Sequence, residues 1–244
     1  MANSPEKPFD RELGQRDETV LLLAQGQKVF KRYTLIRIVG RGGMGVVWLA
    51  RDDELERNIA LKFLPESICH DKEAAADLKR ETRRSLELTH PNIVRIYDFM
   101  HDEERAAIAM EYIDGKSLSA LKVEESNHCF EVRQITSWLQ QLCAALDYAH
   151  NVGRVVHQDL KPANLMVDAK GQLKITDFGI ARSIADSVTR ITAEEAVGGT
   201  LVYMSPQQLN GEKPSPTNDI YSLGATLYDL LTSKPPFYTG LLQH

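Results

Sequence analysis

The spacing of apolar residues changes once along the chain, near residues 110–116, and this change limits the possible folds most strongly. Before it, short β-rich runs predominate, interrupted by one helical stretch at residues 74–88. After it, apolar residues recur every three or four positions, which predicts a long buried helix ending near Gly153 and a second helix at residues 219–231. The expected strands are residues 35–39, 46–50, 58–64, 93–99, 107–110, 155–156, 165–167 and 173–175. The pattern predicts an α+β protein in which a small β-rich half precedes a larger helical half.

Composition sets wider limits. The chain has 244 residues, 43% of them hydrophobic, which is enough for one large domain or two small lobes with real cores. The net charge is −5 without a Lys/Arg block, so we expect neither nucleic acid nor an anionic membrane as the main partner. The early apolar run at residues 20–24 is too short to span a bilayer. The cysteines Cys69, Cys129 and Cys143 have no CxxC spacing, so we expect reduced thiols, no structural metal and a cytoplasmic location, for the whole protein or for the cytoplasmic part of a longer one.

The distribution of polar and apolar residues along the chain suggests three segments. Residues 1–32 are polar, contain several Pro and Gly residues and have no sustained period, so we expect a flexible leader. Residues 33–110 form the β-rich half, and residues 111–244 form the connection and the helical half.

The first candidate site is the glycine-rich run Gly40-Arg41-Gly42-Gly43-Met44-Gly45. Glycines allow the backbone to approach phosphates closely and to offer N–H donors. A GxGxxG pattern alone is weak, because it also marks dinucleotide-binding folds and can be a simple hairpin turn. A dinucleotide fingerprint opens a helix, whereas here the β-branched pair Val46-Val47 and further strand residues follow. The context therefore favours a strand–loop–strand phosphate cover.

The second candidate is Lys62, which lies in an apolar strand and shares a face with Ala60. A lone strand lysine is usually an edge residue that extends its ammonium to water. Glu81, however, falls within the apolar arc of the predicted helix at residues 74–88, and a glutamate there needs a cation. We therefore predict a Lys62–Glu81 pair, the alternative being that Glu81 is a solvated flank residue.

The third candidate comprises two polar clusters between short apolar strands. The first is His157-Gln158-Asp159-Leu160-Lys161-Pro162-Ala163-Asn164, and the second is Asp177-Phe178-Gly179. Asp and Asn oxygens suit Mg²⁺, a lysine can contact a phosphate, and a second Asp can accept a hydroxyl proton. Two polar turns are the simpler alternative, but both clusters must converge in a compact fold.

In this order, the motifs resemble those of the eukaryotic-type protein kinases, which occur in bacteria as well as in eukaryotes. The resemblance covers residues 33–237 and implies a bilobal protein kinase fold with a β-rich N-lobe and a mainly helical C-lobe. It also implies ATP and Mg²⁺ as cofactors and a protein substrate. By this resemblance, Gly40, Gly42, Gly43 and Gly45 cover the phosphates, and Val47, Ala60, Met110, Glu111 and Tyr112 surround adenine, the last two as the interlobe hinge.

The resemblance also implies the catalytic roles. Lys62 holds the α- and β-phosphates and pairs with Glu81. Asp159 accepts the proton of the substrate hydroxyl and Lys161 steadies the γ-phosphate, while Asn164 and Asp177 hold the metal. Asp219 braces the catalytic loop from below.

Ser/Thr specificity is implied by the run from Lys161 to Asn164, and by Gly199-Thr200 ahead of Tyr203-Met204-Ser205-Pro206, where Thr200 could approach Asp159 and Lys161. Autophosphorylation is expected as well.

Three departures from the family pattern concern regulation and the C-lobe. Gln158 replaces the usual Arg before the catalytic Asp, and a neutral amide cannot form a bidentate charged pair with an activation-loop phosphate. Gln207 replaces a Glu that normally ties the activation segment to C-terminal helices. The sequence stops at His244, so we expect a C-lobe that lacks its last helices. We also expect a homodimer formed through the activation segment or C-terminal elements, the alternative being a monomer whose short tail folds back over the exposed apolar patch.

Two alternatives to an active kinase remain. A nucleotide-binding pseudokinase usually loses the Lys, the catalytic Asp or the metal-binding Asp, and this chain has all three. A dinucleotide enzyme would need a helix directly after Gly45.

Overall fold

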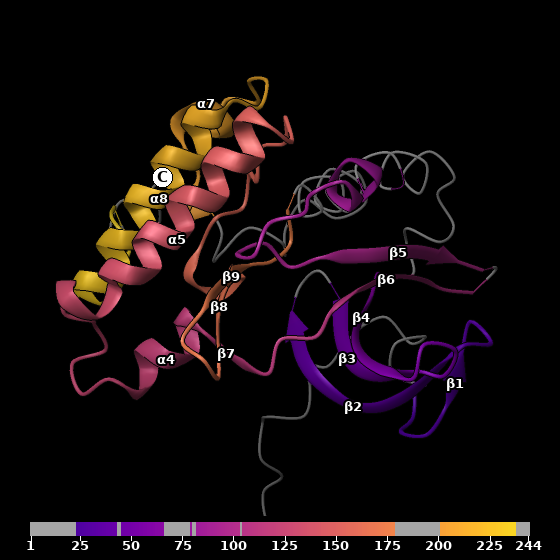
Figure 1. Ribbon diagram of the computed structural model, residues 1–244. Helices are drawn as coiled ribbons and strands as arrows, with labels where there is room; N and C mark the ends of the chain where they lie inside the picture. Colours follow the sequence, from indigo (N-terminus) through magenta and orange to yellow (C-terminus); the bar gives the residue numbers. More distant parts are fainter. Residues whose placement is uncertain are drawn as a thin grey trace, which may run out of the picture.

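The β-rich half is a six-stranded sheet. It is seen in a computed structural model that describes residues 23–42, 45–65, 79, 82–102, 104–178 and 201–237. The strand order is β1-β2-β3-β4-β6-β5, and every neighbouring pair is antiparallel. Figure 1 shows this sheet curving beside the helical half. The strands are β1 (Lys28–Val29), β2 (Tyr33–Gly42), β3 (Gly45–Asp52), β4 (Arg57–Phe63), β5 (Ile96–His101) and β6 (Ala106–Glu111).

The hairpin of β2 and β3 carries the glycine-rich run, as the sequence predicted. Gly42 pairs with Gly45 at its tip. Gly45 has a φ of +115°, and a Cβ at this position would collide with the carbonyl oxygen of Phe63. Only glycine therefore fits where β3 begins beside β4. Because β3 is a strand and follows these glycines directly, the dinucleotide-binding alternative is wrong.

Alternation along β4 divides its side chains between two environments. Ile59, Leu61 and Phe63 belong to the core of the sheet, whereas Ala60 belongs to a second cluster at the border with the helical half. Lys62 points to this same side, and only 4% of its surface is exposed. It is therefore not an edge lysine that reaches into water.

Residues ahead of the boundary expected at residue 33 also take part in the fold. Leu23 and Val29 are buried in the core of the sheet, and β1 pairs with β2. The backbone N–H of Gly26 also donates to the carbonyl of Leu35 at 2.7 Å.

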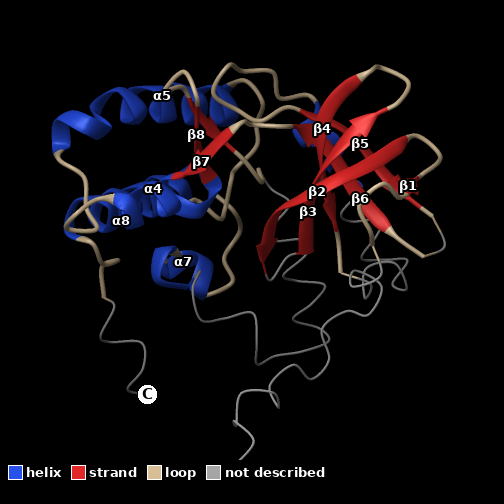
Figure 2. Ribbon diagram, turned by 90° about the horizontal axis from the view of Figure 1, so that it is seen from below, coloured by secondary structure: helices blue, strands red, loops and turns tan. Residues whose placement is uncertain are grey.

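The helical half is built around two long helices, α5 (Val132–Asn151) and α8 (Pro216–Thr232), which lie alongside each other in both views (Figures 1 and 2). α4 (Leu118–Glu124) and α7 (Pro206–Leu209) are the shorter α-helices of this half. In the β-rich half, residues 79 and 82–86 are helical, within the stretch 74–88 where the sequence predicted a helix. α5 buries Ile135, Leu142 and Ala149, a spacing close to that expected from the sequence. α8 starts earlier than predicted because Ser215 caps it and Pro216 fits its first turn. None of the described helices has the length and apolar character needed to cross a membrane.

A three-stranded sheet lies between the two halves (Figure 1), in the order β7-β8-β9. Its strands are β7 (Gly115–Ser117), β8 (Leu165–Asp168) and β9 (Leu173–Ile175). The sequence predicted β8 and β9 but not β7. The strand predicted at residues 155–156 is wrong, because the N–H of Val155 donates to Ala149 and so helps to end α5.

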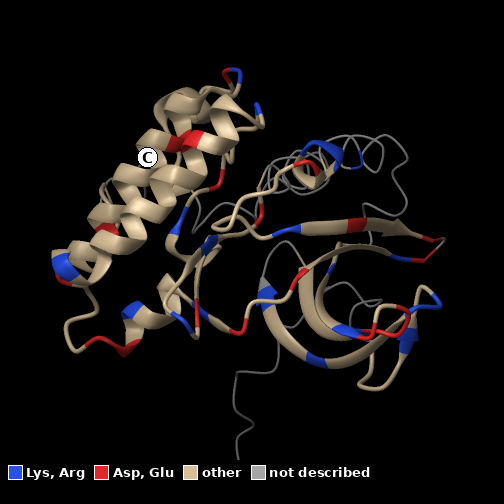
Figure 3. Ribbon diagram, viewed as in Figure 1, with Lys and Arg blue, Asp and Glu red and all other residues tan. Residues whose placement is uncertain are grey.

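Charged residues are interspersed along the described chain rather than gathered by sign, as Figure 3 shows. The arrangement of a sheet-rich part and a helical part confirms the predicted α+β class.

Candidate active site

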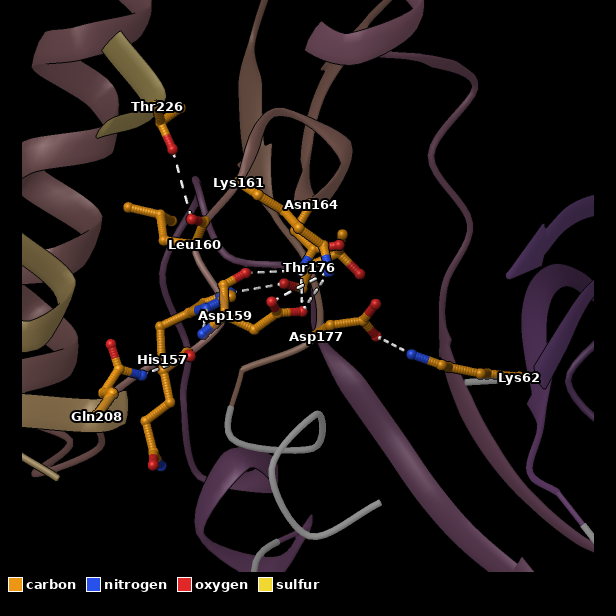
Figure 4. A network of polar contacts seen from close by, with 11 residues as sticks. Lys62, His157, Asp159, Leu160, Lys161, Asn164, Thr176, Asp177, Gln208 and Thr226 are labelled. Atoms are coloured by element: carbon orange, nitrogen blue, oxygen red, sulfur yellow. Dashed lines mark hydrogen bonds and ion pairs between the residues drawn. The ribbon is translucent and has the colours of Figure 1, made fainter. Parts of the chain in front are cut away.

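Asp159 is the centre of the site, and a short 3-10 helix, η1 (Pro162–Asn164), follows it. Only 6% of Asp159 is exposed. The ammonium of Lys161 lies 2.9 Å from its carboxylate, and the side-chain amide of Asn164 donates to the same group at 2.9 Å. Asn164 also donates to the Asp159 carbonyl at 2.8 Å, so the loop closes on itself (Figure 4). The carboxylate is thus held in one orientation by two donors from its own loop.

Asp177 lies next to this loop and joins it to the β-rich half. The Lys62 ammonium contacts the Asp177 carboxylate at 2.7 Å (Figure 4). Burial raises the pKa of Asp177, but the charge and hydrogen bond of Lys62, with the nearby His157 and Lys161, together outweigh burial, so the pKa lies below its ordinary value. Asp177 adopts the left-handed backbone conformation, with a φ of +64°. The side chains of β4 and of the segment after β9 therefore meet at one point.

Buried contacts from the helical half hold the loop that carries Asp159, residues 157–164. Asp219 of α8 is completely buried and accepts the backbone N–H groups of His157 and Gln158, both at 2.8 Å. The brace expected at Asp219 is therefore present. The His157 ring contacts Thr176 through Nε2 at 2.8 Å and packs edge-on against Phe178 with centroids 4.6 Å apart. These contacts fix Asp159 and Asp177 relative to each other.

An apolar cluster at the border of the two halves contains most of the residues expected around adenine. Val47, Ala60, Met110 and Tyr112 all belong to it, together with Val94, Ile113 and Met166. Glu111 ends β6, where the Lys174 ammonium contacts its carboxylate at 2.6 Å. The cluster thus brings together residues of β3, β4, β6 and β8.

Three of the predicted site residues, Gly43, Glu81 and Thr200, lie outside the described residues. Their assignments remain predictions, and so does the Lys62–Glu81 pair. Among the described residues, the carboxylate that contacts Lys62 is that of Asp177. Gly40 lies in the hairpin, opposite Val47.

The donor set suits a magnesium–phosphate group rather than a metal held by protein alone. The described residues contain no group of three or more His, Cys, Asp and Glu side chains placed to hold a metal. Mg²⁺ typically takes one or two protein oxygens and completes its shell with water and substrate phosphates. Asp177 provides a carboxylate. Since the Asn164 side-chain nitrogen faces Asp159, its amide oxygen is left for a ligand.

The sequence did not reveal several contacts of the site. His150 of α5 contacts the Asp219 carboxylate through Nε2 at 2.7 Å, across 69 residues of sequence. Farther away, the Tyr203 hydroxyl donates to Asp229 at 2.9 Å and Lys122 contacts the same carboxylate at 2.7 Å. Burial, and then the Asp229 carboxylate, raise the pKa of Tyr203. No local pattern links residues so far apart in sequence, so only the fold could reveal these pairs.

A cavity of about 190 Å³ on the six-stranded sheet is separate from this site. Arg32, Asp52, Arg57 and Tyr97 line it, and it contains none of the predicted site residues. The candidate active site is therefore defined by converging side chains rather than by this cavity.

Comparison with known proteins agrees with the geometry. Residues 33–243 match the protein kinase domain family, so the chain belongs to that family. It is 40% identical over 210 residues to the serine/threonine-protein kinase PknB of Mycobacterium leprae, covering 84% of this chain and 33% of PknB. It is 37% identical over 212 residues to the serine/threonine-protein kinase PrkC of Bacillus subtilis, covering 87% of this chain and 32% of PrkC.

Among solved structures, the kinase domain of PknI from Mycobacterium tuberculosis is similar, with a TM-score of 0.72 and 27% identity. The match covers 88% of this chain and 79% of that one. These findings confirm the bilobal kinase fold and the resemblance to bacterial kinases of the eukaryotic type. The chain spans about a third of the length of PknB and PrkC.

Proposed function

We propose that this chain is the catalytic part of a serine/threonine protein kinase that transfers the γ-phosphate of Mg²⁺–ATP to protein hydroxyls, including its own. Residues 33–110 act as the N-lobe, and residues 111–244 act as the hinge and C-lobe. The observation that carries the proposal is the convergence of Lys62, Asp159, Lys161, Asn164 and Asp177 between two lobes. The names of PknB and PrkC support the Ser/Thr class.

Each of these side chains has a role that follows from its chemistry. Asp159 orients the substrate hydroxyl and accepts its proton as the oxygen bonds to phosphorus. Lys161 stabilises charge on the transferred phosphoryl group, and Lys62 binds the α- and β-phosphates. Asn164 and Asp177 supply the oxygens that would hold Mg²⁺. Bound Mg²⁺–ATP supplies the phosphoryl group and the positive charge that balances the phosphates, and ADP is released.

The remaining assignments extend this picture. Val47, Ala60 and Met110 form the apolar walls of the adenine site, and the backbone of Glu111 and Tyr112 provides polar partners for adenine. Gly40, Gly42, Gly43 and Gly45 cover the phosphates, Glu81 supports Lys62, and Thr200 approaches the catalytic loop. A cytoplasmic location fits the free thiols of Cys129 and Cys143.

Phosphotransfer from radiolabelled ATP to a protein acceptor tests the proposal, with Mg²⁺ present or chelated. We expect Asp159→Asn to reduce the rate at least about 10²-fold while nucleotide binding persists, because the proton acceptor is lost and the phosphate-binding groups remain. Lys62→Ala and Asp177→Ala should abolish transfer and leave a folded protein, and Asp177→Ala should also weaken Mg²⁺-dependent nucleotide binding. Near-normal turnover in any of these variants at saturating ATP would contradict its role. A wild-type chain that binds nucleotide without transfer would instead be a nucleotide-binding module.

We also propose that the chain forms a homodimer. α8 buries Leu223 and Leu230, yet Ile220 is 56% exposed and Tyr228 is 52% exposed on one side of the helix. Leu209 of the neighbouring α7 is 50% exposed as well. An apolar surface of this kind favours association, through this helix or through the activation segment.

A further inference from the structure

The carbonyls of the residues before and after Asp159 accept hydrogen bonds from side chains of two different helices (Figure 4). Before Asp159, the Gln208 side-chain nitrogen of α7 donates to the carbonyl of Gln158 at 2.9 Å. After it, the Thr226 hydroxyl of α8 donates to the carbonyl of Leu160 at 3.4 Å. The Gln208 bond differs from the Thr226 bond in the part of the chain that supplies the donor, because α7 belongs to the described segment that directly follows residues 179–200. It therefore connects that segment directly to the catalytic loop.

Gln208 reaches the loop in a fixed orientation. Its side-chain amide oxygen accepts the backbone N–H of Ser205 at 3.2 Å, and its backbone N–H donates to the Ser205 hydroxyl at 3.2 Å. These two bonds make a capping box at the start of α7. Asn218 of α8 donates to the same hydroxyl at 2.6 Å. Since the amide oxygen is used at Ser205, the NH₂ group must face Gln158, whose carbonyl can only accept. Little conformational entropy remains to be lost when the bond to the loop forms.

The acceptor of this bond belongs to a constrained residue. Gln158 has a φ of +69°, in the left-handed region that is unfavourable for a residue with a Cβ. It is 7% exposed, and its N–H is held by Asp219 at 2.8 Å. Bonds at both its N–H and its carbonyl keep Gln158 in this conformation. Because Asp159 is the next residue, the direction of its carboxylate depends on them.

We propose that Gln208 is a positioning residue for Asp159. It acts through an uncharged hydrogen bond that couples the segment after residues 179–200 to the catalytic loop. The inference builds on the proposed function, and it adds a consequence for regulation. Because the amide of Gln208 is neutral and its contact is with the Gln158 main chain, the link requires neither a phosphate nor the arginine that Gln158 replaces. It should therefore be insensitive to ionic strength and to phosphorylation.

Gln208→Glu tests the proposal, and Gln207→Glu is the matched control. Gln207 is exposed, and its substitution makes the same chemical change one residue earlier in the chain. The introduced carboxylate keeps an acceptor for Ser205 but places an oxygen against the Gln158 carbonyl. We expect kcat to fall about tenfold at pH 8, equivalent to about 1.4 kcal/mol of barrier, with the KM for ATP within about twofold of wild type. The control should keep kcat within about twofold.

The pH dependence separates positioning from general damage. A carboxyl group facing a carbonyl oxygen becomes protonated more easily, and its O–H can then donate to Gln158. The kcat of Gln208→Glu relative to wild type should therefore recover as the pH falls from 8 towards 5.5. Gln208→Met, which has a similar length but no donor, should show the loss without the recovery. It also serves as the second variant if Gln208→Glu unfolds.

Hydrogen exchange gives a readout that does not need activity. Exchange in peptides covering residues 157–164 should be faster in Gln208→Glu than in wild type, and unchanged in Gln207→Glu. If the wild type transfers no phosphate but this difference appears, the proposed function fails and the Gln208 link stands. Unchanged exchange together with a kcat within twofold of wild type refutes the link. An equal loss in the Gln207→Glu control also refutes it.

Discussion

Replacing Lys62 by Met should destabilise the fold itself, in addition to abolishing phosphotransfer. The Lys62 side chain is 6% exposed and that of Asp177 is 17% exposed, with 2.7 Å between ammonium and carboxylate. Removing one partner of a buried pair leaves the other charge desolvated, typically at about 3–5 kcal/mol. Since Asp177 retains some contact with solvent, we expect the lower end, about 3 kcal/mol. For a domain of this size, that corresponds to a melting temperature about 6–12 °C lower.

The pH dependence of this loss has a definite sign. In the wild type the pKa of Asp177 lies below its ordinary value, so the pair stabilises the fold above about pH 4. That contribution is lost as the pH falls through the folded-state pKa. In Lys62→Met, burial without the ammonium raises the pKa of Asp177, so protonation relieves the unpaired charge. The difference in unfolding free energy between wild type and variant should therefore be largest at neutral pH. It should begin to shrink as the pH falls through the raised pKa of Asp177 in the variant, and shrink further below about pH 4.

Thermal and denaturant unfolding of a double-mutant cycle measures the effect. The cycle combines Lys62→Met and Asp177→Asn, which should couple by about 2 kcal/mol. The matched control is Lys116→Met, because Lys116 contacts Glu124 at 2.6 Å while both side chains are more than half exposed. That substitution should change stability by less than about 1 kcal/mol. If Lys62→Met and Lys116→Met prove equally mild, or the loss does not depend on pH, the reasoning about the buried pair is refuted.

Two predictions follow from the other proposals. Phosphatase treatment should leave the initial rate of phosphotransfer within about tenfold of that of the untreated enzyme, because Gln158 cannot pair with a loop phosphate as an arginine would. A tenfold change corresponds to ~1.4 kcal/mol of activation barrier. A larger loss would show that a loop phosphate matters. Light scattering coupled to size exclusion should show self-association at several tens of micromolar, and Ile220→Lys should weaken it more than Val132→Lys, an equally polar change at a 66% exposed site on α5. A monomer mass across that range would exclude the dimer.

Much of the site could be predicted because its chemistry is concentrated in short motifs. Asp159, Lys161 and Asn164 lie within six residues, and their mutual contacts follow from one tight loop. Lys62 could be placed because strand alternation puts it on the same face as Ala60, and the fold retains that face at the border between the lobes. In each case a local rule was enough.

Contacts between distant residues could not be predicted in this way. The capping box of Ser205 and Gln208 is a local pattern, yet the bond from Gln208 to Gln158 spans 50 residues. β7 has only three residues, and its pairing with β8 depends on a chain reversal that its own sequence does not specify. At residues 155–156, two adjacent valines favour a strand locally. In the fold, however, the N–H of Val155 bonds to the carbonyl of Ala149 at the end of α5 instead of to a neighbouring strand.

The two sides of the site are held by different kinds of interaction. On the C-lobe side, Asp159 is fixed through hydrogen bonds of main-chain groups in its own loop. Two of these groups accept from Gln208 of α7 and Thr226 of α8. Two others donate, to Asp219 of α8 and to the His157 ring. On the N-lobe side, Lys62 reaches the site through its ion pair with Asp177. The lobes are also joined at the back, where the N–H of Val94 donates to Ile175 at 2.8 Å. Because this backbone bond lies near the hinge and does not involve Lys62, a change in lobe angle would alter the Lys62–Asp177 distance first and leave the catalytic loop intact. The orientation of Asp159 is thus set within the helical half, whereas the placement of Lys62 depends on how the two halves meet.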